Sequence, residues 1–516
     1  MQSHMYTENS SRQRLPVAVL VAALLLLAAC GGKDRQTLAE GSDVVVGTSV
    51  AGPTPFISLV PLSGQSIKEV VGYRYTIAPK SGAVTKAVDV GYTSAALTRQ
   101  GHYPAGGSSA TLPVFGLYSG HANKVAIELT YSDGSRQDVA VNISAPAYVD
   151  PFAVYDRRTV VKARVPGTAP DLNYFFIKSG LTGPTVIDSD GEIRWVAPTV
   201  MNAFSSAFEG DGFIVGDPAS LGFSRLGLDG KVSVGTVVAA SKTKFHHSID
   251  HGKVGLLIEL DGTSGGIPII ESSLTEIGPK GNVLKEWDFA DIIGRYMRAR
   301  GDDPSAFIRP GIDWFHINAA TYDARDDSII ASSRENFIIK VGYSDGDIKW
   351  ILGDPAKYWY TFPSLRAKAL KLDAGGLHPI GQHSTSITSK GELMVFNNGL
   401  PSFSFNQPTG APLGEARTYS AVSSYVIDPL LMTARQSWVF DYDKTIFSDI
   451  CSSVYEAKSG SYLVSYAAAK ARNEARLVGL DAARNVVFDY AYDTSKRTCY
   501  TSWNAEPIAF EAMSIR

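Results

Sequence analysis

A turn-and-strand pattern recurs from about residue 150 to the end of the chain. The unit has a turn with Asp, Gly or Asn, then a β-branched residue, then an aromatic or apolar residue two positions further on, with extra residues in the copy that ends at Trp287. Because each copy follows one expected strand and opens another, it is typical of the outer hairpin of a propeller blade. The copies are Asp190–Trp195, Asp229–Val234, Gly281–Trp287, Asp345–Trp350 and two weaker ones that end at Trp438 and Phe488. These six units predict a six-bladed β-propeller over residues 151–516, with long loops between some blades.

Residues 44–150 are predicted to form a small β-sandwich domain that precedes the propeller. Its clearest part is Lys124–Ser144, where apolar residues alternate on both sides of an Asp133-Gly134 turn, as in a hairpin with one buried face. A two-residue period dominates the chain, so the expected fold class is all-β. A helix is expected only in the insertion Asp291–Arg300, whose apolar residues recur at helical spacing.

The stretch Asp313–Pro355 combines a meander with two groups that can hold an anion. Short strands are expected at residues 328–332, 337–341 and 347–352, separated by tight turns rich in Asp and Gly. His316 precedes the first of these strands and Arg334 follows it. Both side chains therefore lie at the ends of elements, where a propeller builds its sites.

The N-terminus is typical of a targeting segment rather than of the fold. Arg12 and Arg14 precede the apolar run Leu15–Ala29, which is too short for a membrane span. The run leads to Leu-Ala-Ala-Cys at 27–30, which looks like a bacterial lipobox whose cysteine, Cys30, becomes the lipidated first residue. An ordinary secretory signal with a chance cysteine is the alternative.

Residues 1–30 are accordingly predicted to be a lipoprotein signal peptide, and residues 31–43 a tether. Gly31 follows the cysteine, which resembles sorting to the outer membrane. We therefore expect a protein attached to a membrane by its lipid anchor, outside the cytoplasm, on the periplasmic face of the outer membrane. The formal net charge of −3 gives no indication of a nucleic-acid partner.

Two cysteines besides Cys30 remain, Cys451 and Cys499. In a compartment where disulfides persist, they can form one disulfide, or they can be two buried free thiols. Sequence separation says nothing about the distance between them, so both alternatives stay open.

Histidines are concentrated in one part of the predicted propeller. A set of histidines spread over successive blades can converge at the centre of the ring, whereas a lone histidine is more often structural. A metal site is the alternative use of such a set, but Arg334 near it argues for an anion. Six of the nine histidines lie in this part: His246, His247, His251, His316, His378 and His383.

Five short motifs occur along the chain in this order: Phe245–Asp250, Asp313–Asn318, Ser332–Arg334, Ile348–Gly353 and Gly381–His383. Together they closely resemble the motifs of the bacterial arylsulfate sulfotransferases. The resemblance covers roughly residues 44–516, and its most specific part is Asp-Trp-Phe-His with an arginine eighteen residues after the histidine. The two cysteines do not resemble the close-spaced pair that some members carry.

This resemblance implies a site and a reaction. His383 corresponds to the nucleophile, which becomes a sulfohistidine, and His247, His316 and Arg334 correspond to residues that hold the sulfuryl oxygens. His246 competes for the role given to His247, and the Ser-Ile-Asp that follows decides the register. The implied reaction moves a sulfuryl group from an aryl sulfate donor to a phenolic acceptor by a ping-pong route, with no cofactor and no metal. No P-loop pattern is present, so a nucleotide sulfate donor is not indicated.

Two alternatives of other classes remain at this stage. A non-catalytic propeller lipoprotein that binds or scaffolds partners predicts that the histidines and Arg334 are scattered and structural. A metal-dependent hydrolase on the same fold predicts that the histidines bind an ion. The sequence leaves the oligomeric state open, with a homodimer as one option, and does not name the natural donor or acceptor.

Overall fold

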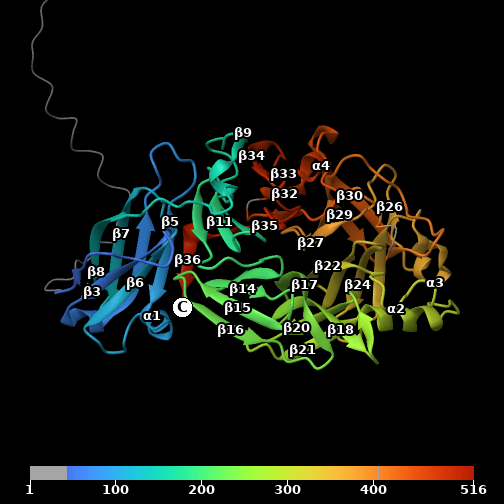
Figure 1. Cartoon of the computed structure of the whole chain (residues 1–516), viewed down its shortest axis with the longest axis horizontal. Coiled ribbons are helices and arrows are strands. Elements are labelled where there is room, and N and C mark those ends of the chain that lie inside the picture. Colours follow the sequence, from blue (N-terminus) through green and yellow to red (C-terminus); the bar gives the residue numbers. More distant parts are fainter. Residues whose placement is uncertain (1–42, 404–405, 459) are drawn as a thin grey trace, which may run out of the picture.

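The computed structural model describes residues 43–403, 406–458 and 460–516. Strands dominate both parts of the molecule, and Figure 1 shows a smaller N-terminal part in blue beside a larger ring of sheets. The predicted all-β fold class is confirmed. The predicted signal peptide, the lipidation site Cys30 and the tether up to residue 42 lie outside the described residues. Within the described part of the chain, no helix combines the length and hydropathy needed to cross a bilayer.

The larger part consists of six antiparallel meanders. The strands β13, β17, β22, β27, β31 and β35 contact one another in succession around the centre, which is the arrangement of a β-propeller (Figure 1). From the centre outward, the first sheet consists of β35 (Asn504–Ile508), β10 (Tyr174–Lys178), β11 (Pro184–Asp188) and β12 (Ile193–Val196). The second consists of β13 (Ser206–Glu209), β14 (Gly212–Gly216), β15 (Gly222–Gly227) and β16 (Val232–Thr236). The third consists of β17 (Lys242–His251), β18 (Leu256–Ser264), β20 (Ser273–Ile277) and β21 (Val283–Asp288), with β19 (Ile267–Ile269) beside β18.

The other three sheets continue the ring. The fourth sheet consists of β22 (Ile317–Asp323), β23 (Ser328–Ser333), β24 (Phe337–Gly342) and β25 (Ile348–Gly353). The fifth consists of β27 (His383–Ile387), β28 (Leu393–Asn397), β29 (Ala421–Asp428) and β30 (Thr433–Phe440), with β26 (Lys371–Leu372) at its edge. The sixth consists of β31 (Ser453–Glu456), β32 (Tyr462–Ala468), β33 (Glu474–Leu480) and β34 (Val486–Asp493), with β9 (Thr159–Lys162) at its edge. The C-terminal strand β35 pairs with β10, so both ends of the propeller sequence share one sheet and close the ring.

The recurring sequence pattern marks the outer strand of every sheet. Its six copies lead into or end within β12, β16, β21, β25, β30 and β34. Several of its aromatic residues pack between neighbouring sheets; Trp195 is fully buried and donates a hydrogen bond of 3.1 Å to the carbonyl of Leu228 in the next sheet. The helix expected near residues 291–300 is also present, as α2 (Phe289–Arg298). The other α-helices are short: α1 (Ser94–Arg99), α3 (Pro363–Arg366) and α4 (Ala469–Arg472).

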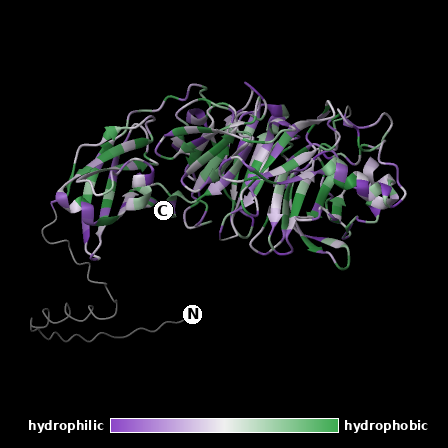
Figure 2. Ribbon diagram, turned by 90° about the horizontal axis from the view of Figure 1, so that it is seen from below, coloured by the Kyte–Doolittle hydropathy of each residue, from purple (hydrophilic) through white to green (hydrophobic). Residues whose placement is uncertain are grey.

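The N-terminal part has two sheets that enclose one apolar core. The predicted hairpin is β7 (Ala122–Tyr131) and β8 (Arg136–Ser144), and Val125, Ile127 and Leu129 are buried on one face. The C-terminal β36 (Met513–Ile515) pairs in parallel with β5 (Val88–Thr93), so the chain end returns to this part after closing the ring. Hydrophobic segments follow the strands in Figure 2. The remaining strands are β4 (Val70–Ile77) beside β7, and β3 (Ile57–Ser63) with β1 (Val45–Val46), β2 (Val50–Ala51) and β6 (Ser109–Phe115).

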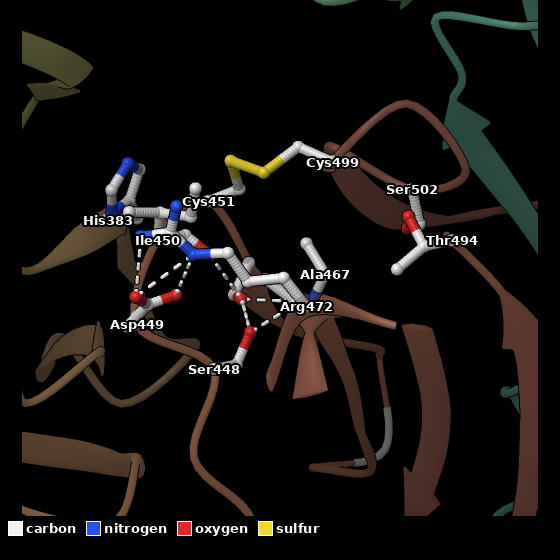
Figure 3. Close-up of a disulfide and its surroundings, with 12 residues drawn as sticks. His383, Ser448, Asp449, Ile450, Cys451, Ala467, Arg472, Thr494, Cys499 and Ser502 are labelled. Carbon is white, nitrogen blue, oxygen red and sulfur yellow. Dashed lines mark hydrogen bonds and ion pairs between the residues drawn. A yellow bond between two sulfur atoms is a disulfide. The ribbon is translucent and has the colours of Figure 1, made fainter. Parts of the chain in front are cut away.

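Cys451 and Cys499 form a disulfide, so the first of the two open alternatives holds. Both residues are buried, and the bond joins the segment before β31 to the segment before β35 (Figure 3). The bond therefore cross-links the two segments that lead into the inner strands β31 and β35.

We expect reduction of this disulfide to destabilise the protein. The cysteines are 48 residues apart, and the chain entropy of such a loop predicts a loss of about 4 kcal/mol in the free energy of unfolding. Urea unfolding with and without reductant measures the loss. The double variant Cys451→Ser/Cys499→Ser is the control, because reductant should not change its midpoint. Two reactive thiols in the native, unreduced protein would contradict the bond.

Candidate active site

Three successive inner strands, β17, β22 and β27, each have a shift in their strand pairing near the histidines. On β17 the pairing shifts within Phe245–Ile249, the segment that contains His246 and His247. On β22 the pairing shifts directly after Ile317, and on β27 directly after His383. A bulge re-aims side chains that would otherwise alternate between faces. Two adjacent histidines can therefore reach one carboxylate.

Several residues at these openings have backbone angles in the left-handed region. The φ angle is 55° at His316, 46° at Glu271 and 53° at Ser384, which follows His383. Such angles are uncommon outside glycine and recur at sites whose geometry the surroundings impose. Gly381 has φ 57°, and a Cβ there would lie 2.1 Å from the carbonyl oxygen of Leu400. Glycine at this position therefore lets the chain turn tightly before His383.

Glu271 is the centre of a cluster of histidines. Its carboxylate is 7% exposed and contacts three imidazole rings. Oε1 lies 2.7 Å from Nε2 of His246, and Oε2 lies 2.8 Å from both Nε2 of His247 and Nδ1 of His316. The Nδ1 atom of His316 also lies 2.6 Å from Oδ2 of Asp313. Two carboxylates thus contact the same nitrogen, Nδ1, of the His316 ring.

The two buried histidines of this cluster differ in charge. Burial disfavours the His316 imidazolium, but Glu271 and Asp313 outweigh it and raise the pKa of His316 to about 10. Burial, together with the neighbouring His246, lowers the pKa of His247 to about 3. Burial alone would raise the pKa of Glu271, but the charge of His316 helps to hold this pKa well below its usual value. At neutral pH the site therefore contains a cationic His316 and a neutral His247.

His383 lies on the other side of the site and is 4% exposed. Its Nδ1 atom is 2.7 Å from Oδ1 of Asn398, and its ring is 6.1 Å from that of Trp503. Burial, and then the charge of Arg334, hold the pKa of His383 well below its usual value. His383 is therefore a neutral imidazole at physiological pH, which is the nucleophilic form of histidine.

Arg334 is a fully buried cation beside this imidazole. Its Nη1 pairs with Glu335 at 2.8 Å, and its guanidinium stacks 4.0 Å above the ring of Phe403. Nη2 makes a long contact of 3.4 Å with the carbonyl of Asp449, whereas Nε is buried and has no hydrogen-bond partner among the described residues. The Nε and Nη2 hydrogens lie on one edge of the guanidinium, so this edge can donate two bonds to an oxyanion.

Aromatic rings surround these polar groups. Trp503 stacks with His247 at 5.2 Å and with Phe204 at 4.6 Å, and Tyr500 meets Phe204 edge-on at 4.8 Å. A Cβ at Gly180 would lie 2.5 Å from the ring of Tyr500, so this glycine permits the packing. Half-buried aromatic rings offer faces and edges to a flat apolar ligand.

The structure brings most of the predicted site residues together. His247 and His316 meet at Glu271, and Arg334, His247 and His316 all lie close enough to His383 to shift its pKa. His246, the competitor of His247, reaches the same carboxylate. His251 is exposed at the far end of β17. The described contacts do not connect His251 or His378 to this cluster. The scattering expected for a non-catalytic propeller is therefore not observed.

The sequence interpretation missed four residues with clear contacts in the site. Asp313 carried a signal, since it precedes His316 by three positions in the same motif. Glu271, Asn398 and Trp503 carried none, because they stand in loops far from the histidines they contact.

Two groups in the described part of the chain have donor atoms close enough to hold a metal ion: His246, His247 and Glu271, and Glu271, Asp313 and His316. Their closest nitrogen-to-oxygen separations are 2.6–2.8 Å. Two ligands on a tetrahedral zinc, with bonds of about 2.0 Å, are about 3.3 Å apart. The separations are those of hydrogen bonds, so the groups are arranged as ion pairs and would have to move apart to bind a metal.

The family model and the curated relatives agree on one family. A model of the family described as Arylsulfotransferase (ASST) matches residues 158–507. The chain is 25% identical over 499 residues to the arylsulfate sulfotransferase AssT of Escherichia coli O6:H1, covering 76% of this chain and 79% of that protein. Identity is also 25%, over 497 residues and with the same coverage, to AssT of Lelliottia amnigena. Among solved structures, the β-propeller domain of Cps50 (Swd1) aligns with a TM-score of 0.33 and 11% identity, over 65% of this chain and 99% of that one.

Proposed function

This chain belongs to the arylsulfotransferase family, and we propose that it transfers a sulfuryl group from an aryl sulfate to a phenolic acceptor through a covalent intermediate on His383. One observation carries the proposal: His383 is a buried neutral imidazole whose pKa is lowered by burial and by the nearby charges of Arg334 and His316. A neutral imidazole can attack sulfur, Arg334 can hold the oxygens of the group that it receives, and His316 can protonate the leaving phenolate.

In the first half-reaction, a ring nitrogen of His383 forms a bond to sulfur while the bond between sulfur and the aryl oxygen breaks. The electron pair of that bond goes to the departing phenolate. His316 protonates the phenolate through Nε2, because Nδ1 is held by Glu271 and Asp313. Its pKa, raised to about 10, lies in the range of a simple phenol, about 10, so His316 can give the proton to the leaving phenolate and take one back from the acceptor.

The second half-reaction reverses these steps with a different phenol. The acceptor gives its proton to the neutral His316, its oxygen forms the new bond to sulfur, and the bond between nitrogen and sulfur breaks. His316 and His383 return to their starting states, so the cycle consumes only the aryl sulfate and the phenolic acceptor and no net proton. This is a ping-pong reaction, since the first phenol leaves before the second reacts.

The remaining groups orient the sulfuryl group and the rings. Arg334 donates from its Nε and Nη2 edge to two sulfuryl oxygens. His247 gives its Nε2 hydrogen to Glu271, so its Nδ1 is unprotonated and can accept a hydrogen bond from the hydroxyl of the phenolic acceptor. Trp503, Phe204 and Phe403 flank the donor and acceptor rings.

A transfer assay with chelated enzyme tests this proposal against the metal-dependent hydrolase. After exhaustive treatment with EDTA, the enzyme should still convert an aryl sulfate and a phenol into the exchanged pair at the untreated rate. Without the phenol, steady turnover should be slow, because water replaces the acceptor poorly. Loss of activity with EDTA that a single divalent ion restores, together with release of free sulfate, would instead establish metal-dependent hydrolysis.

A further inference from the structure

Asn398 stands directly after β28 and is fully buried. Its side-chain amide makes three short contacts. Nδ2 donates to the carbonyl of Ser448 at 2.6 Å and to the carbonyl of Cys451 at 2.9 Å, and Oδ1 lies 2.7 Å from Nδ1 of His383. No other side chain contacts Nδ1 of His383 in the described part of the chain.

These contacts fix which atom of the amide faces the histidine. Backbone carbonyls only accept hydrogen bonds, so the NH₂ group of Asn398 must face Ser448 and Cys451. The oxygen of Asn398 then faces Nδ1 of His383, and this oxygen also only accepts. The second neighbour of Nδ1, the carbonyl of Gly381 at 3.3 Å, is an acceptor as well. A nitrogen between two acceptors carries the hydrogen, so Nδ1 is the protonated position of the neutral ring.

The two carbonyls that orient Asn398 are themselves held in place. The Ser448 backbone N–H donates to Oγ of Ser420 at 2.8 Å, and that hydroxyl donates to the carbonyl of Asn398 at 2.9 Å. Cys451 is fixed by its disulfide to Cys499. Figure 3 shows Ser448, Asp449 and Cys451 on one segment beside His383. The amide is thus oriented by a buried, cross-linked segment.

We propose that Asn398 is a positioning residue that holds His383 in the Nδ1–H tautomer and thereby makes Nε2 the atom that bonds to sulfur. This inference rests on the proposed function. When Nε2 takes the sulfuryl group and the phenolate leaves, the ring, still protonated at Nδ1, gains positive charge. Its Nδ1–H then becomes a stronger donor to Oδ1 of Asn398. The contact therefore stabilises the transition state more than the resting enzyme.

The first test is the position of the hydrogen and of the sulfuryl group in the wild-type enzyme. Long-range ¹H–¹⁵N NMR of enzyme labelled at histidine, with His383→Gln to assign the signal, should show the Nδ1–H tautomer at rest. After incubation with an aryl sulfate and no acceptor, the sulfuryl group should be on Nε2. An Nε2–H tautomer, or an adduct on Nδ1, would overturn this inference alone. No adduct on His383 at all would overturn the proposed function.

The second test removes the amide. In Asn398→Leu we expect the rate of the first half-reaction to fall about 100-fold, with the aryl sulfate KM changed much less. The matched control is Asn397→Leu, which removes a neighbouring, equally buried amide whose partners are Ser423 and the backbone of Ile380. It should lower the thermal midpoint by a similar amount but slow the half-reaction only a few-fold. Equal losses of rate in the two variants, or an unchanged tautomer in Asn398→Leu, would reduce Asn398 to a structural residue.

Discussion

Replacing His383 with alanine should abolish transfer. We expect kcat to fall by at least about 10⁴-fold, because no other group in the site can take the sulfuryl group at the same position. The release of phenol in the first turnover should disappear as well. The fold should persist, since the change removes a single ring at the start of β27.

His251→Ala is the matched control for this variant. His251 is exposed at the end of β17 and should tolerate the change without loss of rate. Stopped-flow measurement of phenol release and steady-state transfer would be compared in the two variants at equal concentrations of folded protein. Turnover of His383→Ala at the wild-type rate would show that another residue is the nucleophile.

Arg334→Lys should lower kcat by about 10² to 10³-fold, although the positive charge is kept. An ammonium group cannot reproduce the two-pronged donation from Nε and Nη2, the stacking on Phe403, or the geometry of the pair with Glu335. We expect the rate of the half-reaction to fall much more than the affinity for an aryl sulfate.

The control separates lost chemistry from lost stability. Arg194 is also almost fully buried and pairs with Asp188 at 2.9 Å, but it lies between the first sheet and the N-terminal part. Arg194→Lys should lower the thermal midpoint while leaving the activity per folded molecule nearly unchanged. If Arg334→Lys behaves in the same way, Arg334 supports the fold rather than the sulfuryl oxygens.

The propeller could be predicted from the sequence because its signal is local. Each outer strand follows a turn and carries an aromatic or apolar residue a few positions later, and Trp195, Trp287 and Trp350 are examples. The strand pairing that closes the ring could not be predicted from such local patterns. The strand β35 joins β10 across more than three hundred residues, and a two-residue period does not identify a strand's partner.

The site was predictable only where its residues stand in recognisable motifs. Strand alternation places His246 and His247 on opposite faces, and only the bulge in β17 lets both reach Glu271. Glu271 stands 24 residues after His247 and 45 before His316, in a loop without a distinctive pattern. Long-range contacts of this kind depend on the closed ring rather than on local spacing.

The disulfide also could not be predicted from the sequence. Cys451 and Cys499 are 48 residues apart, and the sequence allowed both a bond and two free thiols. Only the packing of the last sheet against β35 brings the two segments together. The same bond holds the segment whose carbonyls orient Asn398.

The most direct measurement of the central claim uses an aryl sulfate and no acceptor. The wild-type enzyme should release phenol in a burst equal to its own concentration, and digestion should yield a peptide with His383 that is heavier by one sulfuryl group. Addition of a phenol should then remove this mass and form the new aryl sulfate. A sulfuryl group on another residue, or a burst without any covalent adduct, would contradict the account.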